Sequence, residues 1–286
     1  MKKNATSVRS IVALALVACF SAPLFADEAP TPEHTLTGNL GLFSSYRFRG
    51  IDQTFGKPAL QGGFDYSHAS GIYLGNWNSN VSSGAGYPEG NLEMDFYGGY
   101  KTTFGDFGID LGALYYYYPG SKYSGAALNG KYPGKTADGT VSNGEVYVGA
   151  SWKFLSLKYS YAVTDYFSVP ETDGTSYLDL AANYDLGDGW GVNAHVGHLF
   201  MKDLRYTNAD GSTDNGSYTD WKLGVTKDIS GWVLSAAYIG TDAQGKCANG
   251  EFYCFSNSLG SNGVQNGSKT KDAGRGTAVL SVSRTF

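Results

Sequence analysis

The chain has 286 residues, a formal net charge of −5 and a mean hydropathy of −0.26. That hydropathy is too polar for a bundle of membrane helices, and the acidic balance argues against nucleic acid as a partner. Aromatic residues nevertheless make up 15% of the chain, and glycine occurs 40 times. This combination is unusual for a soluble domain, whereas a membrane β-barrel needs aromatic side chains at both lipid interfaces and glycine in its turns.

The first 26 residues predict a cleaved export signal. Lys2, Lys3 and Arg9 precede an apolar run at residues 11–18, which is too short to span a bilayer. Small residues at 21–26 place the cleavage after Ala26, but residues 16–19 also fit a lipoprotein box with lipidation at Cys19. Either cut sends the chain out of the cytoplasm. Residues 27–34 are expected to form a flexible periplasmic lead-in, and residues 35–286 form a single domain, because no linker interrupts them.

The body of the chain contains no run of eighteen apolar residues, so a closed barrel is the remaining form that could span a membrane. Alternating residues predict its strands: at 91–103, Leu92 and Phe96 share one face, while Glu93 and Asp95 share the other. The predicted fold class is all-β, a transmembrane antiparallel up-and-down β-barrel of about twelve strands. In chain order the strands are 35–48, 58–68, 72–80, 91–103, 107–118, 143–154, 155–166, 176–185, 190–202, 218–226, 231–241 and 274–286.

The links between these strands alternate in length. Links after the even-numbered strands are tight turns with Gly, Asp or Ser, except for a near-direct reversal at 154–155. The other links are longer, notably 119–142, 203–217 and 242–273. Short periplasmic turns and long outer loops are typical of outer-membrane barrels. An even strand count also brings both chain ends to the periplasmic side.

Strand alternation assigns a set of charged and aromatic side chains to the barrel interior. They either select solutes as a pore lining or pair with one another and plug a small barrel. In the tyrosine run at 115–118, Tyr115 and Tyr117 face lipid as a girdle and the other two face inward. The predicted pore-lining residues are Arg47, Arg49, Asp65, Glu93, Asp95, Lys101, Asp110, Tyr116, Tyr118, Glu145, Lys153, Lys158 and Asp179.

Catalytic and metal sites are not expected. His195 faces the lumen and His198 the lipid side, without a Ser partner that the sequence can place. His34 and His68 lie at the periplasmic edge and look incidental, and the four histidines have no close ligand spacing. The segment at 210–216 hints at a calcium loop. The required glycine and glutamate positions hold Asn and Trp instead, so a mobile polar loop is the better interpretation.

Two further features concern the end of the chain. Cys247 and Cys254 lie in the last long loop, and two such cysteines in an exported protein usually form a disulfide, which here would restrain that loop. The predicted last strand stops on Phe286, and a terminal aromatic residue is what the assembly machinery of outer-membrane barrels reads. We expect Phe286 to be an assembly signal.

Several segments resemble the TorF-type porin family of conserved proteobacterial proteins. They include Ser-Tyr-Arg-Phe-Arg-Gly-Ile at 45–51, Pro-Ala-Leu-Gln-Gly-Gly-Phe-Asp-Tyr at 58–66 and Asn-Trp-Asn-Ser-Asn-Val at 76–81. Later blocks lie at 115–120, 145–152 and 220–227, so the resemblance covers nearly the whole mature chain. It implies an outer-membrane channel and carries over no catalytic residue.

We therefore expect a passive channel for small hydrophilic solutes in the outer membrane of a Gram-negative bacterium. Its expected partners are those solutes, outer-membrane lipid and lipopolysaccharide, and the barrel assembly machinery, with neither cofactor nor metal. The alternative is a non-transporting structural or adhesin-like barrel that acts through its extracellular loops. An outer-membrane lipase is the third possibility, and the sequence offers least for it.

Overall fold

The computed structural model describes residues 32–127 and 136–286. The predicted signal peptide, with both of its cleavage options, lies outside these residues, as does most of the lead-in. None of the described helices is long and apolar enough to cross a bilayer.

Twelve strands form one closed antiparallel barrel, in which consecutive barrel strands pair and β1 pairs with β18. The predicted fold class and strand count are therefore confirmed. The connecting segments carry the short pairs β2 (Arg47–Phe48) with β3 (Ile51–Asp52), β12 (Tyr206–Thr207) with β13 (Thr213–Asp214), and β16 (Cys254–Ser256) with β17 (Thr270–Asp272). The barrel strands are β1 (His34–Phe43), β4 (Ala59–His68), β5 (Ile72–Asn80), β6 (Leu92–Phe104), β7 (Phe107–Ala127), β8 (Thr136–Trp152), β9 (Leu155–Ala162), β10 (Ser176–Gly187), β11 (Trp190–Phe200), β14 (Tyr218–Ile229), β15 (Trp232–Thr241) and β18 (Thr277–Thr285).

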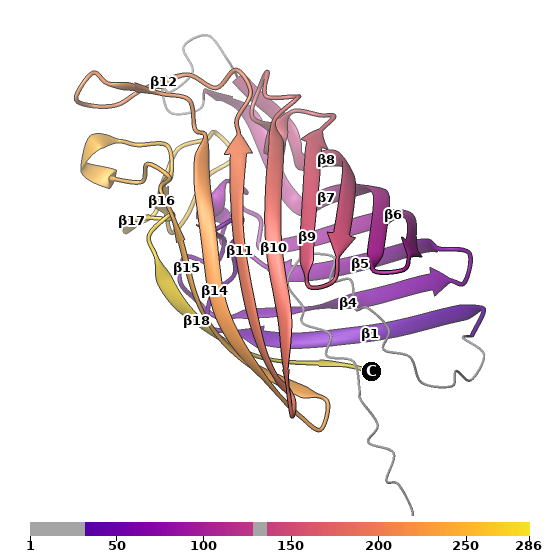
Figure 1. Cartoon of the computed structure of the whole chain (residues 1–286). Helices are drawn as coiled ribbons and strands as arrows, with labels where there is room; N and C mark the ends of the chain where they lie inside the picture. The colour runs from indigo at the N-terminus through magenta and orange to yellow at the C-terminus, as the bar shows by residue number, and fades with distance from the viewer. Residues whose placement is uncertain (1–31, 128–135) are drawn as a thin grey trace, which may run out of the picture.

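The two ends of the barrel differ, as the alternation of link lengths predicts. At one end, turns of two or three residues join the strands, for example between β6 and β7 and between β14 and β15. At the other end, the long links gather with β12, β16 and β17 (Figure 1). These links also hold the 3₁₀ helices η1 (Ser83–Ala85), η2 (Tyr166–Ser168) and η3 (Cys247–Asn249). We call the two ends the turn end and the loop end.

The outward face of the wall is apolar. Leucines such as Leu36, Leu74 and Leu223 expose more than half of their surface there. Near the turns the outward residues become aromatic, as at Phe104, Trp152, Trp190, Trp232 and Phe286. An apolar band bordered by aromatic residues matches the layers of a bilayer, since Trp and Tyr favour the headgroup level.

The first predicted strand is too long. Alternation continues to Phe48, but β1 ends at Phe43 and the chain then leaves the wall. Residues 47–52 form the hairpin β2–β3, whose turn has Arg49 at φ 46° and Gly50 at φ 79°. A left-handed residue followed by glycine reverses the chain tightly, and this turn directs the hairpin into the barrel.

Inside the barrel, tyrosine rings lie flat over glycines of the neighbouring strand. Tyr97 on β6 is opposite Gly75 on β5, and Tyr147 on β8 is opposite Gly112 on β7. A Cβ atom at either glycine would overlap the tyrosine ring. Glycine at these positions therefore lets large rings lie along the wall, and from there the Tyr97 hydroxyl donates to Asp65 at 2.5 Å.

The Gly75→Ala substitution is expected to destabilise the barrel, because the new methyl group must displace the Tyr97 ring and break its bond to Asp65. We expect a loss of about 1–3 kcal/mol in the free energy of unfolding, the usual cost of overpacking a filled interior. Urea unfolding in detergent, followed by tryptophan fluorescence, measures it. The matched control is Gly149→Ala on β8, where the nearest atom to a new Cβ is at 3.5 Å. Equal stability of the two variants would contradict the packing role of Gly75.

Candidate functional site

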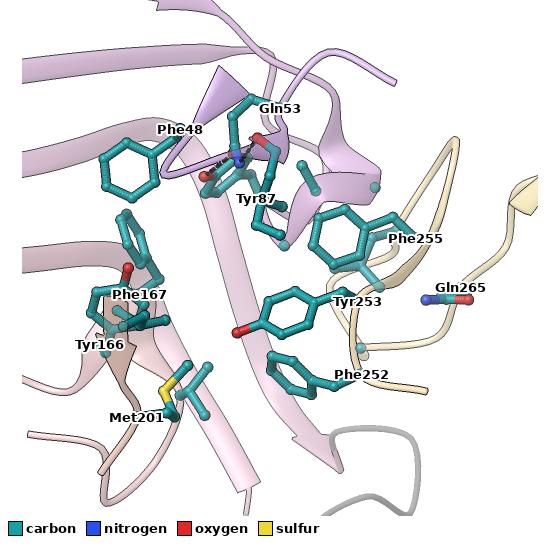
Figure 2. A pocket seen from close by; sticks show the side chains of 18 of the residues that line it. Phe48, Gln53, Tyr87, Tyr166, Phe167, Met201, Phe252, Tyr253, Phe255 and Gln265 are labelled. Atoms are coloured by element: carbon teal, nitrogen blue, oxygen red, sulfur yellow. Dashed lines mark hydrogen bonds between the residues drawn. The ribbon is translucent and has the colours of Figure 1, made fainter. Parts of the chain in front are cut away.

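The loop end closes over an apolar pocket of about 160 Å³. Its walls come from several links: Phe48 and Gln53 from the hairpin segment, Tyr166 and Phe167 from the β9–β10 link, and Tyr253 from the β15–β18 link. Figure 2 shows the hairpin and the β9–β10 link on one side of this space and the β15–β18 link on the other. Below this pocket the hairpin crosses the barrel.

Arg49 at the tip of the hairpin joins it to the far wall. Its Nη2 donates to Glu145 Oε2 on β8 at 2.8 Å, and its Nη1 donates to the Tyr166 hydroxyl at 3.0 Å. In the closed ring of strands, β8 stands nearly opposite β1, from which the hairpin starts. The hairpin therefore spans the lumen rather than lining one side of it.

Aromatic faces surround the Arg49 guanidinium. Its central carbon lies 4.3 Å from the centre of the Tyr177 ring and 4.9 Å from that of Phe48. These cation–π contacts add to the ion pair in a place shielded from water. Burial raises the pKa of Tyr166 to about 12, so its phenol stays neutral and accepts the bond from Arg49.

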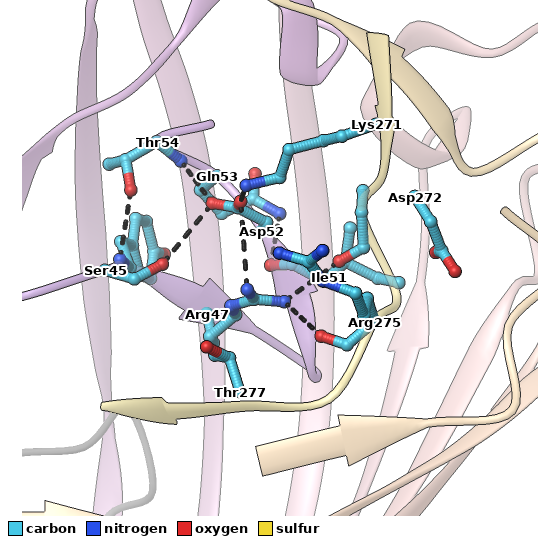
Figure 3. Close-up of polar contacts among 12 residues, drawn as sticks. Ser45, Arg47, Ile51, Asp52, Gln53, Thr54, Lys271, Asp272, Arg275 and Thr277 are labelled. Carbon is cyan, nitrogen blue, oxygen red and sulfur yellow. Dashed lines mark hydrogen bonds and ion pairs between the residues drawn. The ribbon is translucent and has the colours of Figure 1, made fainter. Parts of the chain in front are cut away.

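The base of the hairpin is anchored to the β15–β18 link (Figure 3). The buried carboxylate of Asp52 pairs with Lys271, accepts from the Thr54 amide at 3.0 Å and lies 3.8 Å from Arg47. Arg47 also donates to the carbonyl oxygens of Ala273, at 3.0 Å, and Arg275, at 3.2 Å. The hairpin is thus tied at both ends, to the wall at Glu145 and to the last long link at Lys271.

The same link contains a disulfide between Cys247 and Cys254. Cys254 begins β16, and β16 pairs in register with β17, where Cys254 faces Asp272. Lys271, which holds Asp52, is the neighbouring residue in β17. The disulfide therefore restrains the segment that anchors the hairpin.

Beneath the hairpin, β6 presents two buried acids. Glu93 accepts from the Tyr46 hydroxyl at 2.9 Å, whereas neither carboxylate oxygen of Asp95 meets a hydrogen-bond donor in the described part of the chain. Asp95 lies between Trp77 and Tyr116 in the sheet register, and the hairpin segment packs Tyr46 on the first and Phe48 on the second. The hairpin segment thus covers a buried carboxyl group that makes no hydrogen bond within the described residues.

Towards the turn end the lumen holds tyrosine–acid pairs and lysines. The Tyr73 hydroxyl donates to Asp110 at 2.6 Å and contacts the Tyr147 hydroxyl. Lys158 lies 4.0 Å above the Tyr147 ring, and Lys101 lies 5.5 Å from that of Tyr73. This part of the lumen is therefore lined by both basic and acidic side chains, together with tyrosine hydroxyls.

His195 lies between two carboxylates. Its Nδ1 is 2.7 Å from Asp179 on β10, its Nε2 is 2.5 Å from Asp220 on β14, and Asp220 also accepts from Tyr177 at 2.8 Å. A doubly protonated imidazole satisfies both contacts, since both of its nitrogens are then donors. This bridge joins three strands across the inner wall.

The structure places most of the predicted interior residues inside the barrel. Two predictions need correction. Arg47 and Arg49 lie on the inward hairpin rather than on a barrel strand, because the chain leaves the wall after Phe43. Lys153 lies in the exposed turn between β8 and β9 at φ 54°, because the expected direct reversal is a two-residue turn. The predicted residues that face the lumen from the wall are Asp65, Glu93, Asp95, Lys101, Asp110, Tyr116, Tyr118, Glu145, Lys158 and Asp179.

Sequence reasoning missed some members of this network. Asp220 was available from alternation, since Trp221 and Leu223 face outward on β14 and Asp220 is therefore inward. Asp52 and Lys271 carried no such signal, because they lie in links and meet only through the tertiary fold.

The histidines at the turn end, which looked incidental in the sequence, lie side by side in the structure. His34 and His68 are register partners in β1 and β4, and with Glu33 they place three possible metal ligands within 4.8 Å of one another. His68 Nδ1 accepts from the Ser70 amide at 3.1 Å, and its Nε2 lies 3.5 Å from Glu33. His34 Nδ1 lies 2.8 Å from the Tyr66 hydroxyl.

Removing the His195 ring is expected to destabilise the barrel strongly, because Asp179 and Asp220 then remain close together without a cation. We expect His195→Ala to cost about 3–5 kcal/mol, as for one partner of a buried ion pair. The matched control is His198→Ala on the same strand, where the ring makes one hydrogen bond, to Thr219 at 2.9 Å. Urea midpoints in detergent measure both variants. If His195→Ala costs no more than its control, the bridge does not stabilise the barrel.

Comparison with solved structures finds outer-membrane porins and channels at low sequence identity. The NanC porin has a TM-score of 0.46 and 11% identity, over 88% of this chain and 99% of that one. The KdgM porin, solved in complex with disordered oligogalacturonate, has a TM-score of 0.46 and 9% identity, over 88% and 98%. The COG4313 outer membrane channel from Pseudomonas putida F1 has a TM-score of 0.41 and 12% identity, over 93% and 100%.

No curated protein matches this chain. A family model does match it, over residues 27–286, which is the whole length apart from the predicted signal peptide. The matched span is nearly the same stretch over which the sequence resemblance runs. The chain therefore belongs to the family described as a bacterial protein of unknown function (Gcw_chp).

Proposed function

We propose that this protein is an outer-membrane channel through which small hydrophilic solutes diffuse passively past the hairpin β2–β3. The observation that carries the proposal is a closed barrel with an apolar outer band and a charged interior, crossed by one inward hairpin. Charges inside a barrel are costly unless they are paired or hydrated, so a charged interior suits an aqueous path. In this arrangement the loop end faces the medium and the turn end faces the periplasm of a Gram-negative cell.

Asp95 favours a channel over a non-transporting barrel. A hairpin that served only to fill and stabilise the interior would be expected to pair the acids that it covers, because a buried polar group without a hydrogen bond is costly. Asp95 is fully buried and neither of its carboxylate oxygens is hydrogen-bonded within the described residues. Movement of the hairpin would expose this carboxyl group to the lumen, where it could face a passing solute.

Where Arg49 meets Glu145, the hairpin contacts the far wall and constricts the lumen. One edge of this constriction is cationic and comes from the hairpin, and the other is acidic and comes from the wall. Opposite charges across a narrow lumen produce a transverse field, which orients small polar or zwitterionic solutes and sets ion preference. This arrangement supports small hydrophilic solutes as the cargo.

The remaining partners belong to the same proposal. Outer-membrane lipid and lipopolysaccharide would contact the apolar band, and the assembly machinery would read Phe286, whose ring is exposed at the turn end. Catalysis is not part of the proposal. Both ring nitrogens of His195 contact carboxylates, which leaves neither of them to activate a serine hydroxyl.

Releasing the tip of the hairpin is expected to widen the path. In the double variant Arg49→Gln with Glu145→Gln, the ion pair is lost without leaving either charge unpaired. We expect unit conductance to rise by about 1.5-fold or more, because the hairpin then leaves the constriction more often. Single-channel recording in planar bilayers measures it.

The matched control for this variant is Lys57→Gln, which removes an exposed charge from the same link. Its conductance should equal that of the parent. A folded parent barrel that shows no discrete steps would favour the structural or adhesin-like alternative. Steps unchanged in the double variant would instead show that the hairpin does not limit conduction.

Acids under the hairpin are expected to favour cations. Neutralising them in the double variant Glu93→Gln with Asp95→Asn should shift the reversal potential in a KCl gradient towards anion preference. The shift should shrink with added salt, since screening shortens the reach of a charge from about 8 Å at 0.15 M to about 3 Å at 1 M. The control is Asp185→Asn with Asp188→Asn, two exposed acids at the turn end. Equal shifts in both double variants would place Glu93 and Asp95 outside the conduction path.

A further inference from the structure

The pocket at the loop end differs in chemistry from the charged lumen below it. Its walls are largely aromatic and aliphatic, from Phe48 of the hairpin and Phe167 of the β9–β10 link to Leu199, Met201 and Phe255 (Figure 2). The volume is about 160 Å³. A charged hydrophilic path does not require such a chamber, so the pocket calls for an explanation of its own.

Several polar side chains that border the pocket already make hydrogen bonds within the protein. Tyr87 donates to Gln53 Oε1 at 2.6 Å, and Gln53 Nε2 donates to the Ile51 carbonyl at 3.0 Å. The Tyr253 hydroxyl donates to the Gly216 carbonyl at 2.5 Å, and Gln265 Nε2 donates to the Cys254 carbonyl at 3.0 Å. A sugar placed here would have to break these bonds or lose its own to water, and either loss costs free energy. The lining therefore favours an apolar molecule over a carbohydrate.

One wall of the pocket is held in a strained conformation. Phe167 has φ 49° and ψ 42°, and Ser168 follows at φ 58°, although neither is glycine. Such backbone is unfavourable for residues other than glycine and clusters at functional sites. Here it places the Phe167 ring edge-on or tilted against the rings of Phe48, Tyr87 and Tyr116. The wall is thus formed before any ligand arrives, which lowers the cost of binding.

We propose that this pocket binds a small neutral molecule with one aromatic ring. Dry apolar cavities of about 150 Å³ bind benzene, so the volume fits a single ring with small substituents. Edge-to-face contacts with the surrounding rings would add to the burial of apolar surface. This binding site is separate from the proposed channel function. Binding at equilibrium can be measured whether or not the barrel conducts.

Binding would also act on the constriction. Phe48, Ile51 and Gln53 line the pocket and belong to the hairpin segment that crosses the lumen. Tyr166 lines the pocket as well and accepts the hydrogen bond from Arg49. A bound ring would therefore brace the hairpin against the β9–β10 link.

The test uses 4-fluorophenol as the probe and follows its fluorine NMR signal with the full barrel in lipid nanodiscs. Empty nanodiscs give the correction for partition into lipid. We expect saturable binding to the parent protein, whereas a fluorinated glucose should not bind. Saturable binding of the sugar without binding of the phenol would overturn the proposal.

Two variants locate the site. Ala85→Phe places a ring in the pocket from η1 and should weaken binding at least tenfold. The matched control Ala248→Phe makes the same change at an exposed residue of η3 and should leave binding unchanged. Phe255→Ala removes a ring from the pocket wall and should weaken binding several-fold. It tests the same site if the Ala85→Phe variant does not fold. Parent affinity in both pocket variants, with folding verified by heat-modifiable mobility, would exclude this pocket as the site.

Discussion

Closure of the barrel between β1 and β18 is the constraint on which the rest of the structure depends. An open sheet edge would leave backbone groups unpaired in lipid, where each costs several kcal/mol. The seam is continued past β18 by reciprocal bonds between the backbones of Gly38 and Phe286, at 2.7 and 2.9 Å. Once the ring is closed, each strand has one face towards lipid and one towards a narrow lumen. Side chains as different as Leu74 and Asp95 are sorted by that single rule.

A narrow lumen forces charges together, and the protein supplies the counter-charges from separate elements. The wall contributes acids at Glu145 on β8 and at Asp220 on β14, and the cations that meet them are Arg49 from the hairpin and His195 from β11. The hairpin in turn brings Asp52, which is met by Lys271 from the last link. The hairpin and the last link therefore supply charges opposite to those that they meet.

The hairpin divides the interior into two environments in series. Above it, aromatic walls border a pocket in which the Tyr87 and Tyr253 hydroxyls already donate hydrogen bonds within the protein. Below it, tyrosine hydroxyls and carboxylates line the lumen as far as the turn end. Phe48 contributes to the pocket while its neighbour Arg49 holds the wall, so two adjacent residues belong to the two environments. An event at the outer mouth can thus reach the constriction through one rigid turn.

The sequence by itself determined the barrel, because a period of two in residue type is a local property that needs no knowledge of distant contacts. Strand number, inward and outward faces, and the difference between the two ends all follow from it, as the inward Glu93 and Asp95 illustrate. The same local rule led to error where the chain leaves the wall, since alternation continues through Arg47 although the strand has ended.

Contacts between residues far apart in the chain were decided only by the tertiary structure. Arg49 with Glu145, Asp52 with Lys271, and the links that close the aromatic pocket depend on where the loops fold once the barrel is closed. The physical reason is that a loop residue has no fixed face. Its partner is chosen by charge and shape across the lumen, and neither is encoded in the neighbouring sequence.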